Sequence, residues 1–229
     1  MGNLETAEDA RPALADARAV TVLVGLPAST DAALLRRRAH EAVDEMRVIA
    51  PALGLVVAYP GTEGAPEAAE AGIDASTGSG APLRFIEYLL PQSGTSTVPW
   101  LGLAPAYRRL SELAADAGAA ACVVLSPDLA AFDARSIQSL AEPLLAARAD
   151  LAMPLYAPSK YEGLLNSSIL YPFTRALYGR RIRYPLAPDF GVSAALLERL
   201  GRPGPRGNQT DREQNAVWPA TEAVPDNCE

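Results

Sequence analysis

The sequence predicts an α/β fold, in which a Rossmann-like, mostly parallel sheet carries helices on both faces. Short apolar runs rich in β-branched residues recur at residues 19–26, 54–59 and 121–125. Segments with apolar residues at helical spacing separate these runs. Such alternation of strand and helix is typical of a parallel sheet. Because parallel strand–helix–strand units close with one hand, we expect the strand ends and the loops after them to meet at one edge.

The composition predicts one domain with a substantial core. The chain has 229 residues, of which 49% are hydrophobic. We expect a single domain over residues 19–229, preceded by a disordered or loosely helical segment, residues 1–18. The formal net charge of −7 argues against nucleic acid as a partner. Two cysteines give no disulfide framework, and we find neither a signal peptide nor an apolar run that would span a bilayer, so we expect a cytoplasmic protein.

Local sequence patterns predict the helices and strands of the amino-terminal half. The strand at residues 19–26 leads into a turn, residues 25–31, whose polar end offers Ser29, Thr30 and Asp31 as helix caps. The next helix extends to about residue 50, and its predicted inward residues are Leu34, Leu35, Ala39, Val43, Met46 and Ile49. A second strand, residues 54–59, precedes a long loop over residues 60–82 that is rich in Gly, Ala, Ser and Thr.

The carboxyl-terminal half is less regular. Residues 83–90 fit a helix or a strand equally, whereas residues 106–117 form a helix with Leu110, Leu113 and Ala114 inward. A helix over residues 134–148 contains Pro143, and residues 150–156 read as another strand. The last predicted elements are a helix over residues 164–178, interrupted at Pro172, and a helix that starts near Ser193.

The turn Ser126-Pro127-Asp128 is the first candidate for function. It follows the buried run at residues 121–125, and open α/β sheets bind their ligands beyond the carboxyl ends of such strands. Asp128 is therefore a candidate metal ligand. In the alternative interpretation, Ser126 and Asp128 only cap the helix that follows.

A second group of polar residues lies further along the chain. Asn166, Ser167, Thr174 and Arg175 interrupt an apolar stretch, so they either bond to one another or face a ligand. The arginines at positions 180, 181 and 183 either grip an anion or form a solvated charge run. Asp189 either caps the next helix or projects into the cleft.

These residues belong to a longer pattern. The chain resembles a group of bacterial family-2-type glycosyltransferases, related to the glucosyl-3-phosphoglycerate and mannosylglycerate synthases, in this array: Asn166-Ser167, Tyr171-Pro172-x-Thr174-Arg175-Ala176-Leu177-Tyr178-Gly179-x-Arg181-Ile182-Arg183-x-Pro185 and Asp189-Phe190-Gly191-x-Ser193. The resemblance extends more weakly from about residue 20 to residue 223. It implies the A-type glycosyltransferase fold, a nucleoside diphosphate sugar as donor, and Mg²⁺ or Mn²⁺ as cofactor.

The resemblance also implies roles for individual residues. Residues 27–31 match the turn after the first strand, where the donor binds: Pro27, Ala28, Ser29 and Asp31, with Asp31 at the nucleotide base. Ser126 and Asp128 stand at the Asp-x-Asp motif, whose hard oxygen ligands hold the cation that bridges the donor phosphates. The implied acceptor side comprises the acidic Asp189, as catalytic candidate, with Asn166, Thr174, Arg175 and Arg181.

Several positions depart from the family pattern. Ser126 replaces the first aspartate of the motif, and Tyr59-Pro60-Gly61 lacks the aspartate usual after the second strand. Leu101-Gly102-Leu103-Ala104-Pro105 lacks the lysine of a Gly-Lys-Gly stretch. The family's histidine ligand, expected beyond the segment at residues 217–223, is absent from the sequence.

Two functional hypotheses follow. In the first, the chain moves a hexose from a nucleotide sugar to a small, anionic acceptor with the help of a divalent cation. In the second, it is a catalytically degenerate relative that binds nucleotide sugars without transferring them. A sugar nucleotidyltransferase or a dinucleotide-dependent oxidoreductase is disfavoured because no glycine-rich phosphate loop follows the first strand. The Tyr- and Leu-rich stretch at residues 155–186 supports a homodimer as a further hypothesis.

Overall fold

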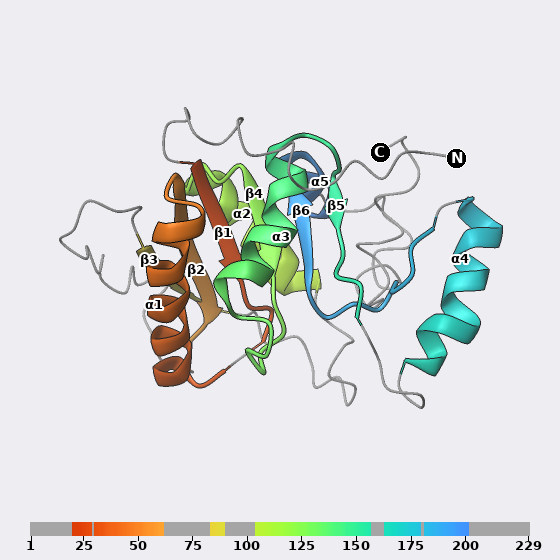
Figure 1. The fold of residues 1–229 in the computed structure, drawn as a ribbon, viewed down its shortest axis with the longest axis horizontal. Coiled ribbons are helices and arrows are strands. Elements are labelled where there is room, and N and C mark those ends of the chain that lie inside the picture. Colours follow the sequence, from red (N-terminus) through yellow and green to blue (C-terminus); the bar gives the residue numbers. More distant parts are fainter. Residues whose placement is uncertain are drawn as a thin grey trace.

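A six-stranded sheet forms the centre of the protein, with strand order β3-β2-β1-β4-β6-β5 (Figure 1). The computed structural model describes residues 20–28, 30–61, 83–89, 104–156, 163–179 and 181–201. The strands in sequence order are β1 (Val20–Gly25), β2 (Leu53–Pro60), β3 (Leu83–Tyr88), β4 (Ala121–Val124), β5 (Leu151–Ala152) and β6 (Phe190–Ser193). β1 pairs in parallel with β2 and β4, and β2 with β3, whereas β6 is antiparallel to both β4 and β5.

Helices cover both faces of this sheet, so the predicted fold class is confirmed. The helices are α1 (Ala32–Ile49), α2 (Ala104–Asp116), α3 (Ala134–Leu145), η1 (Leu165–Leu170, π-helical), α4 (Tyr171–Tyr178) and α5 (Ala194–Gly201). Figure 1 shows α1 and α3 on one face and α2 and α5 on the other. None of the described helices is long and apolar enough to cross a membrane.

Two hydrophobic cores lie on the two sides of the sheet. In the central strands, alternate residues enter alternate cores: Val22 and Val24 pack with α1 and α3, whereas Leu23 packs with α2 and α5. In β4, Val123 joins the first core and Cys122 the second. A strand buried on both faces needs apolar residues at every position, which explains the uninterrupted runs in the sequence.

The structure corrects several predicted elements. Residues 83–88 form a strand, which settles the open choice there. The strand predicted over residues 150–156 is wrong in length, since only Leu151 and Ala152 pair with β6. β6 itself was missed: because Asp189-Phe190-Gly191 is short and leads directly into a helix, its sequence gave no strand signal. Ile49, predicted to face inward, is 41% exposed because α1 ends there.

The helix predicted over residues 164–178 is present, but its first part is π-helical. Pro172 lies at the start of α4, just after the π-helical turns. A proline ring cannot donate a backbone hydrogen bond, and a wider π turn accommodates that loss. The predicted amino-terminal segment 1–18, most of the loop over residues 60–82, and the segments at 101–103 and 217–223 lie outside the described residues.

Candidate functional site

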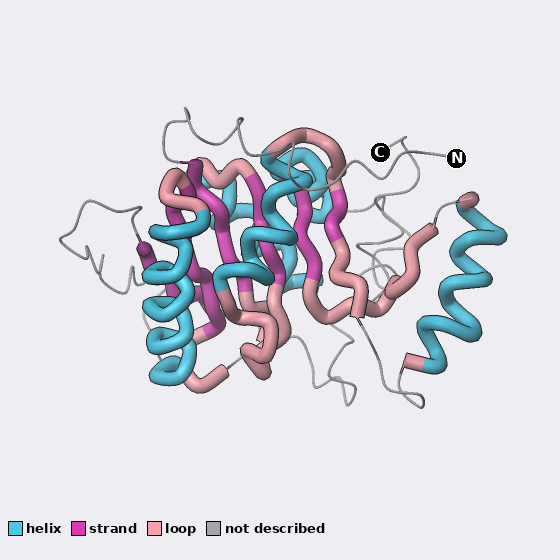
Figure 2. The backbone as a smooth tube through the Cα atoms, viewed as in Figure 1, coloured by secondary structure: helices cyan, strands magenta, loops and turns pink. Residues whose placement is uncertain are grey.

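The turns after β1 and β4 lie against each other, as the parallel topology predicts. Thr30 Oγ1 donates a hydrogen bond of 2.8 Å to the carbonyl oxygen of Pro127. Just before the turns, the amide of Leu125 donates to the carbonyl of Gly25 at 3.0 Å. Figure 2 shows the loops that follow these strands gathered at one edge of the sheet. The two predicted donor-side segments therefore share one location.

Asp31 caps helix α1. Its Oδ1 accepts hydrogen bonds from the amides of Ala33 and Leu34, at 2.9 and 3.1 Å, and its side chain is exposed. A carboxylate at this position satisfies amides that the first turn of a helix leaves unpaired. Of its neighbours, Pro27 is buried and Ala28 is half-buried, while Ser29 lies outside the described residues.

Asp189 is a buried carboxylate that joins three segments. It is 5% exposed. Its Oδ1 accepts from the amide of Ser126 and its Oδ2 from the hydroxyl of Tyr156, both at 2.8 Å. Its own amide donates to the Tyr156 hydroxyl oxygen at 3.3 Å. The turn after β4, the segment after β5 and the approach to β6 are thus held by one side chain.

This arrangement excludes one of the two alternatives for Asp189, the helix cap. The cap of α5 is Ser193, whose hydroxyl oxygen accepts from the amide of Leu196 at 3.2 Å and donates to Asp150 at 2.6 Å. Asp189 is therefore not a helix cap but a bridge at the carboxyl edge of β4. Such a buried charge is tolerated because both oxygens accept hydrogen bonds.

Tyr156 is the partner that the sequence analysis missed. Burial raises the pKa of its phenol, and the hydrogen bond to Asp189 and the charges of Asp189 and Asp128 raise the pKa further. The phenol therefore stays protonated and donates to the carboxylate. The only sequence signal was its place at the end of the predicted strand 150–156, where an aromatic residue has no distinctive pattern.

Asp128 is exposed at the tip of the turn, one residue beyond the carbonyl that Thr30 binds. Its Oδ1 accepts from the amide of Ala130 at 2.9 Å, which closes a local turn. The cap of helix α3 is instead Asp133, which accepts from the amide of Ser136 at 2.9 Å. The alternative in which Ser126 and Asp128 cap this helix is therefore wrong, because four further residues separate Asp128 from the cap.

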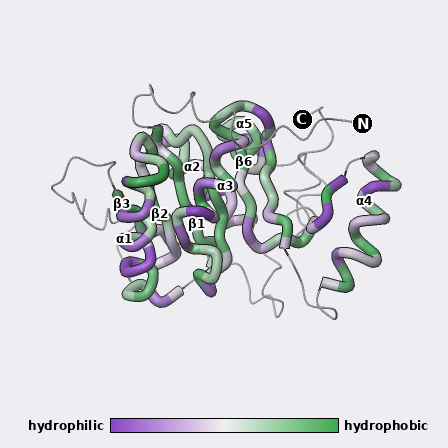
Figure 3. The backbone as a smooth tube through the Cα atoms, viewed as in Figure 1, coloured by the Kyte–Doolittle hydropathy of each residue, from purple (hydrophilic) through white to green (hydrophobic). Residues whose placement is uncertain are grey.

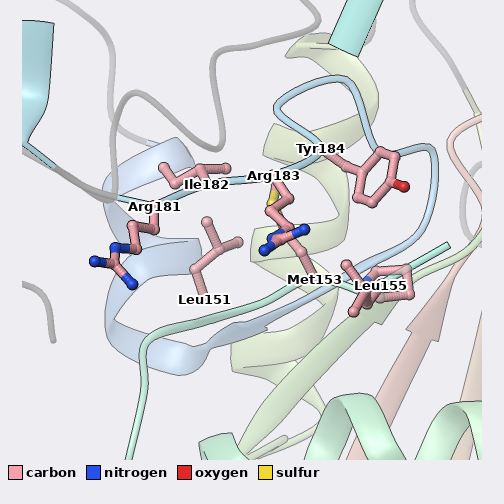
Figure 4. Close-up of a pocket in the computed structure, with 8 residues that line it drawn as sticks. Leu151, Met153, Leu155, Arg181, Ile182, Arg183 and Tyr184 are labelled. Atoms are coloured by element: carbon pink, nitrogen blue, oxygen red, sulfur yellow. The ribbon is translucent and has the colours of Figure 1, made fainter. Parts of the chain in front are cut away.

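A pocket of about 350 Å³ lies beside the Asp189 bridge. Figure 4 shows Arg181, Arg183 and Tyr184 on one side of it and Leu151, Met153 and Leu155 on the other. The Tyr184 hydroxyl donates to the carbonyl of Tyr156 at 2.8 Å, and the two rings meet edge to face with centroids 5.2 Å apart. The pocket is thus connected to Asp189 through two tyrosines, and its two guanidinium groups suit an anion.

Two of the other predicted acceptor-side residues, Asn166 and Thr174, form hydrogen bonds with the backbone of this chain. Asn166 Oδ1 accepts from the amide of Leu186 at 3.2 Å. The buried Thr174 donates its hydroxyl to the carbonyls of Leu170 and Tyr171, at 2.8 and 3.1 Å. Arg175 is exposed on α4 and is not among the residues that line the pocket. Of the four, only Arg181 lies at the pocket.

No protein-family model matches the chain, and no curated protein matches it. Among solved structures, the chain is similar to glucosyl-3-phosphoglycerate synthase from Mycobacterium tuberculosis in complex with phosphoglyceric acid, with 18% sequence identity and a TM-score of 0.47. The similarity covers 86% of this chain and 63% of that one, so the chain spans less than two thirds of its length. The function therefore has to be argued from this chain's own residues.

Proposed function

We propose that the chain is a glycosyltransferase of A-type fold that moves a hexose from a nucleoside diphosphate sugar to a small anionic acceptor. The observation that carries the proposal is the hydrogen bond between the Ser126 amide and the Asp189 carboxylate. It joins the donor-side turn to the segment that leads to a pocket with two arginines. A transferase needs both substrates at one place, and this bond fixes the two sides relative to each other.

The donor would bind over the two turns that the Thr30–Pro127 hydrogen bond holds together. In this proposal the segment 27–31 contacts the nucleotide and the turn 126–128 contacts the diphosphate. Exposed backbone and side-chain groups beyond the strand ends are where open α/β sheets bind nucleotides.

The residues of the turn at 126–128 would bind a cation only together with the phosphates of the donor. Among the described residues, no group of three or more His, Cys, Asp or Glu side chains is placed to hold a metal ion. Mg²⁺ needs no such group, since it commonly binds one or two carboxylates together with substrate phosphates and water. Asp128 is the one carboxylate that we assign to it, and the cation would neutralise charge on the leaving diphosphate.

The acceptor would bind in the pocket of about 350 Å³, a volume at the lower end for small-molecule sites. Arg181 and Arg183 would pair with its carboxylate or phosphate group, because guanidinium groups bind such anions through two parallel hydrogen bonds. Asp189, with both oxygens engaged, would act by keeping the pocket in register with the donor turn. Asn166 and Thr174 would act at a distance, by positioning the segment that carries the arginines.

Calorimetry tests the donor side of this proposal. UDP-glucose and GDP-mannose are titrated into the protein with and without Mn²⁺. We expect binding that requires the cation, and a roughly 10- to 100-fold weaker affinity in Asp128→Asn, in line with the loss of a charged interaction. Asp116→Asn, an exposed acid at the end of α2, is the matched control.

The same titration, combined with an assay of sugar transfer to small acids, separates the two hypotheses for the chain. Metal-independent binding with no sugar transfer to any small acid would identify a degenerate binding protein. If neither donor produces heat on titration, and Asp128→Asn behaves like the wild type, the proposed donor site is wrong.

A further inference from the structure

The pocket beside Asp189 has mostly apolar walls. Its lining residues divide into three polar ones, Arg181, Arg183 and Tyr184, and five apolar ones, Leu151, Met153, Pro154, Leu155 and Ile182. Figure 4 shows the apolar side chains beside the two guanidinium groups. The guanidinium groups suit an anionic group on the ligand, and the apolar walls have to be matched by the rest of the ligand.

The polar groups of this pocket donate hydrogen bonds but offer almost no side-chain acceptor. Guanidinium groups only donate. The Tyr184 hydroxyl gives its own hydrogen to the carbonyl of Tyr156 at 2.8 Å, so only its oxygen can still accept. None of the eight lining residues is Asp, Glu, Asn, Gln, Ser, Thr or His. A hydroxyl group that leaves water needs an acceptor, so a ligand with several hydroxyl groups would leave most of them without a side-chain partner here.

A second, apolar hollow adjoins this pocket. Its volume is about 380 Å³. It is lined by Ser139, Leu140, Pro143, Ala149, Leu151, Ala152, Met153, Pro154 and Leu155. Ser139 has the one polar side chain among these nine residues, and its hydroxyl already donates to the carbonyl of Ser136 at 3.0 Å. The second hollow therefore offers apolar contact rather than hydrogen bonds.

The two hollows share the segment 151–155, at the margin of the sheet. β5 is the last strand in the sheet order. Leu151 and Met153 pack against the core on the α2 and α5 side, whereas Ala152 packs against the core on the α1 and α3 side. Leu155 lines both hollows and is 71% exposed. An apolar chain that outgrows the first hollow therefore meets the second at Leu155.

Charge and apolar surface are separated across this site. In Figure 3 the stretch between α4 and β6 includes strongly hydrophilic positions, whereas the segment that continues from β5 is largely hydrophobic. The arginines come from the first of these segments, and most of the apolar wall comes from the second. A ligand that matches both has its charge at one end and apolar carbon at the other.

We propose that the acceptor is an amphiphilic acid, in which a phosphate or carboxylate group held by Arg181 and Arg183 is joined to an apolar alkyl or aryl body instead of a polyhydroxylated one. Calling this ligand the acceptor rests on the proposed transferase function, whereas the preference of the pocket for an apolar body does not. An acceptor keeps one hydroxyl group to receive the sugar, and the Tyr184 oxygen is the side-chain atom of the pocket that can accept from it.

A matched pair of phosphate esters tests this preference. n-Propyl phosphate and glycerol 3-phosphate have the same anion and the same three-carbon chain, and they differ by two hydroxyl groups. Isothermal titration into the full chain should give an affinity for n-propyl phosphate that is at least about 10-fold higher, because the hydroxyl groups of glycerol lose water without gaining acceptors. From n-propyl to n-butyl and n-hexyl phosphate, the affinity should rise by up to about four-fold for each methylene group that is buried.

Two variants locate the apolar body. Leu155→Asn places an amide where the hollows meet, at a position with little buried side chain. It should flatten the rise in affinity along the alkyl series and leave the affinity for glycerol 3-phosphate within about two-fold of the wild type. Met153→Gln, a side chain of similar length, tests the wall of the pocket in the same way. Leu177→Asn, exposed on α4 and outside both hollows, is the matched control. Circular dichroism of each variant establishes that the fold is kept.

The possible results separate this inference from the proposed function. An affinity for glycerol 3-phosphate that equals or exceeds the affinity for n-propyl phosphate would overturn the inference and leave the anion site in place. A preference for the alkyl esters that persists in both Leu155→Asn and Met153→Gln would also overturn it. If neither these esters nor 3-phosphoglycerate binds, the acceptor pocket of the proposed function is itself wrong, and the inference is wrong as well.

Discussion

The backbone amide of Ser126 donates a hydrogen bond of 2.8 Å to the carboxylate of Asp189, although 63 residues separate them in the sequence. The bond connects the end of a parallel strand to the start of an antiparallel one. Because β4 and β6 are neighbours in the sheet, the two ends lie at the same edge. The same carboxylate binds the Tyr156 hydroxyl, so three loops share one acceptor.

Removing this carboxylate should destabilise the protein. Asp189→Ala leaves the Ser126 amide and the Tyr156 hydroxyl without their acceptor in a buried place, which costs about 2–4 kcal/mol of unfolding free energy. Asp189→Asn keeps an oxygen for Ser126 and should cost about 1 kcal/mol. Urea unfolding measures both. Equal losses in the two variants would show that charge rather than hydrogen bonding matters at this position.

The raised pKa of Tyr156 predicts that the protein loses stability at alkaline pH. Its pKa in the folded protein lies above the ordinary value of 10.0 because of burial and the bond to Asp189. Above about pH 10 the unfolded chain therefore releases this proton first, and stability that is full below pH 10 falls as the pH rises. Burial likewise raises the pKa of Cys122, to about 12, and the pKa values of Tyr88 and Tyr107.

The variant Tyr156→Phe measures how much Tyr156 contributes to the loss of stability at alkaline pH. The variant is expected to be less stable than the wild type at pH 8, where it lacks the hydrogen bond, and to lose less stability between about pH 9 and 11. Urea midpoints across this range provide the measurement. Tyr178→Phe, on the exposed side of α4, is the control. Parallel curves for wild type and Tyr156→Phe would refute the link between this phenol and alkaline stability.

The parallel part of the fold could be predicted because its signals are local. The double-sided burial of β1, β2 and β4 requires continuous apolar runs, and these runs are visible in the sequence. β6 was missed because four residues with a glycine carry no periodicity, and tertiary pairing with β4 and β5 makes them a strand. The helix at 171–178 was visible, but the π-helical turns before it depend on how the backbone adapts near Pro172.

The candidate site likewise contains residues that the sequence singles out and residues that it does not. Asp128 was singled out because it follows a recognisable buried run, and Asp189 because it precedes a predicted helix and matches the family pattern; their roles in a site stay predictions. Tyr156 and Tyr184 could not be singled out, since their importance lies in bonds to distant backbone and carboxylate groups. Asn166 and Thr174 were expected to bond to one another or to face a ligand, whereas their hydrogen-bond partners in the structure are backbone atoms of this chain.

The two pocket arginines should control binding of an anionic acceptor. Arg181→Gln removes one positive charge from the pocket while keeping a side chain of similar length. Arg183→Gln does the same at position 183. Each should weaken binding of a small phosphorylated acid such as 3-phosphoglycerate roughly 10- to 100-fold, as expected for a charge-assisted hydrogen bond. Isothermal titration with the acid measures this loss.

The control for these variants is Arg148→Gln, an exposed arginine after α3 that lies outside the pocket. Its affinity for the acid should equal that of the wild type. An equal loss of affinity in Arg148→Gln would mean that binding of the acid depends on the overall charge of the protein. Unchanged affinity in both pocket variants would show that the acceptor does not bind in this pocket.

Gly191 is expected to tolerate no side chain. It lies in β6, two residues after Asp189, and a Cβ atom built on it would come within 2.7 Å of the Leu140 carbonyl oxygen and 2.8 Å of Leu144 Cδ1. The carbonyl belongs to the backbone of α3, so it cannot rotate away as a side chain can. Gly191→Ala should therefore push β6 from α3 and cost about 1–3 kcal/mol. Gly25→Ala offers the comparison, because the nearest atoms there are the flexible end of Leu110. Urea unfolding should give the larger loss for Gly191→Ala, and a loss no larger than that of Gly25→Ala would contradict the close packing of β6 on α3.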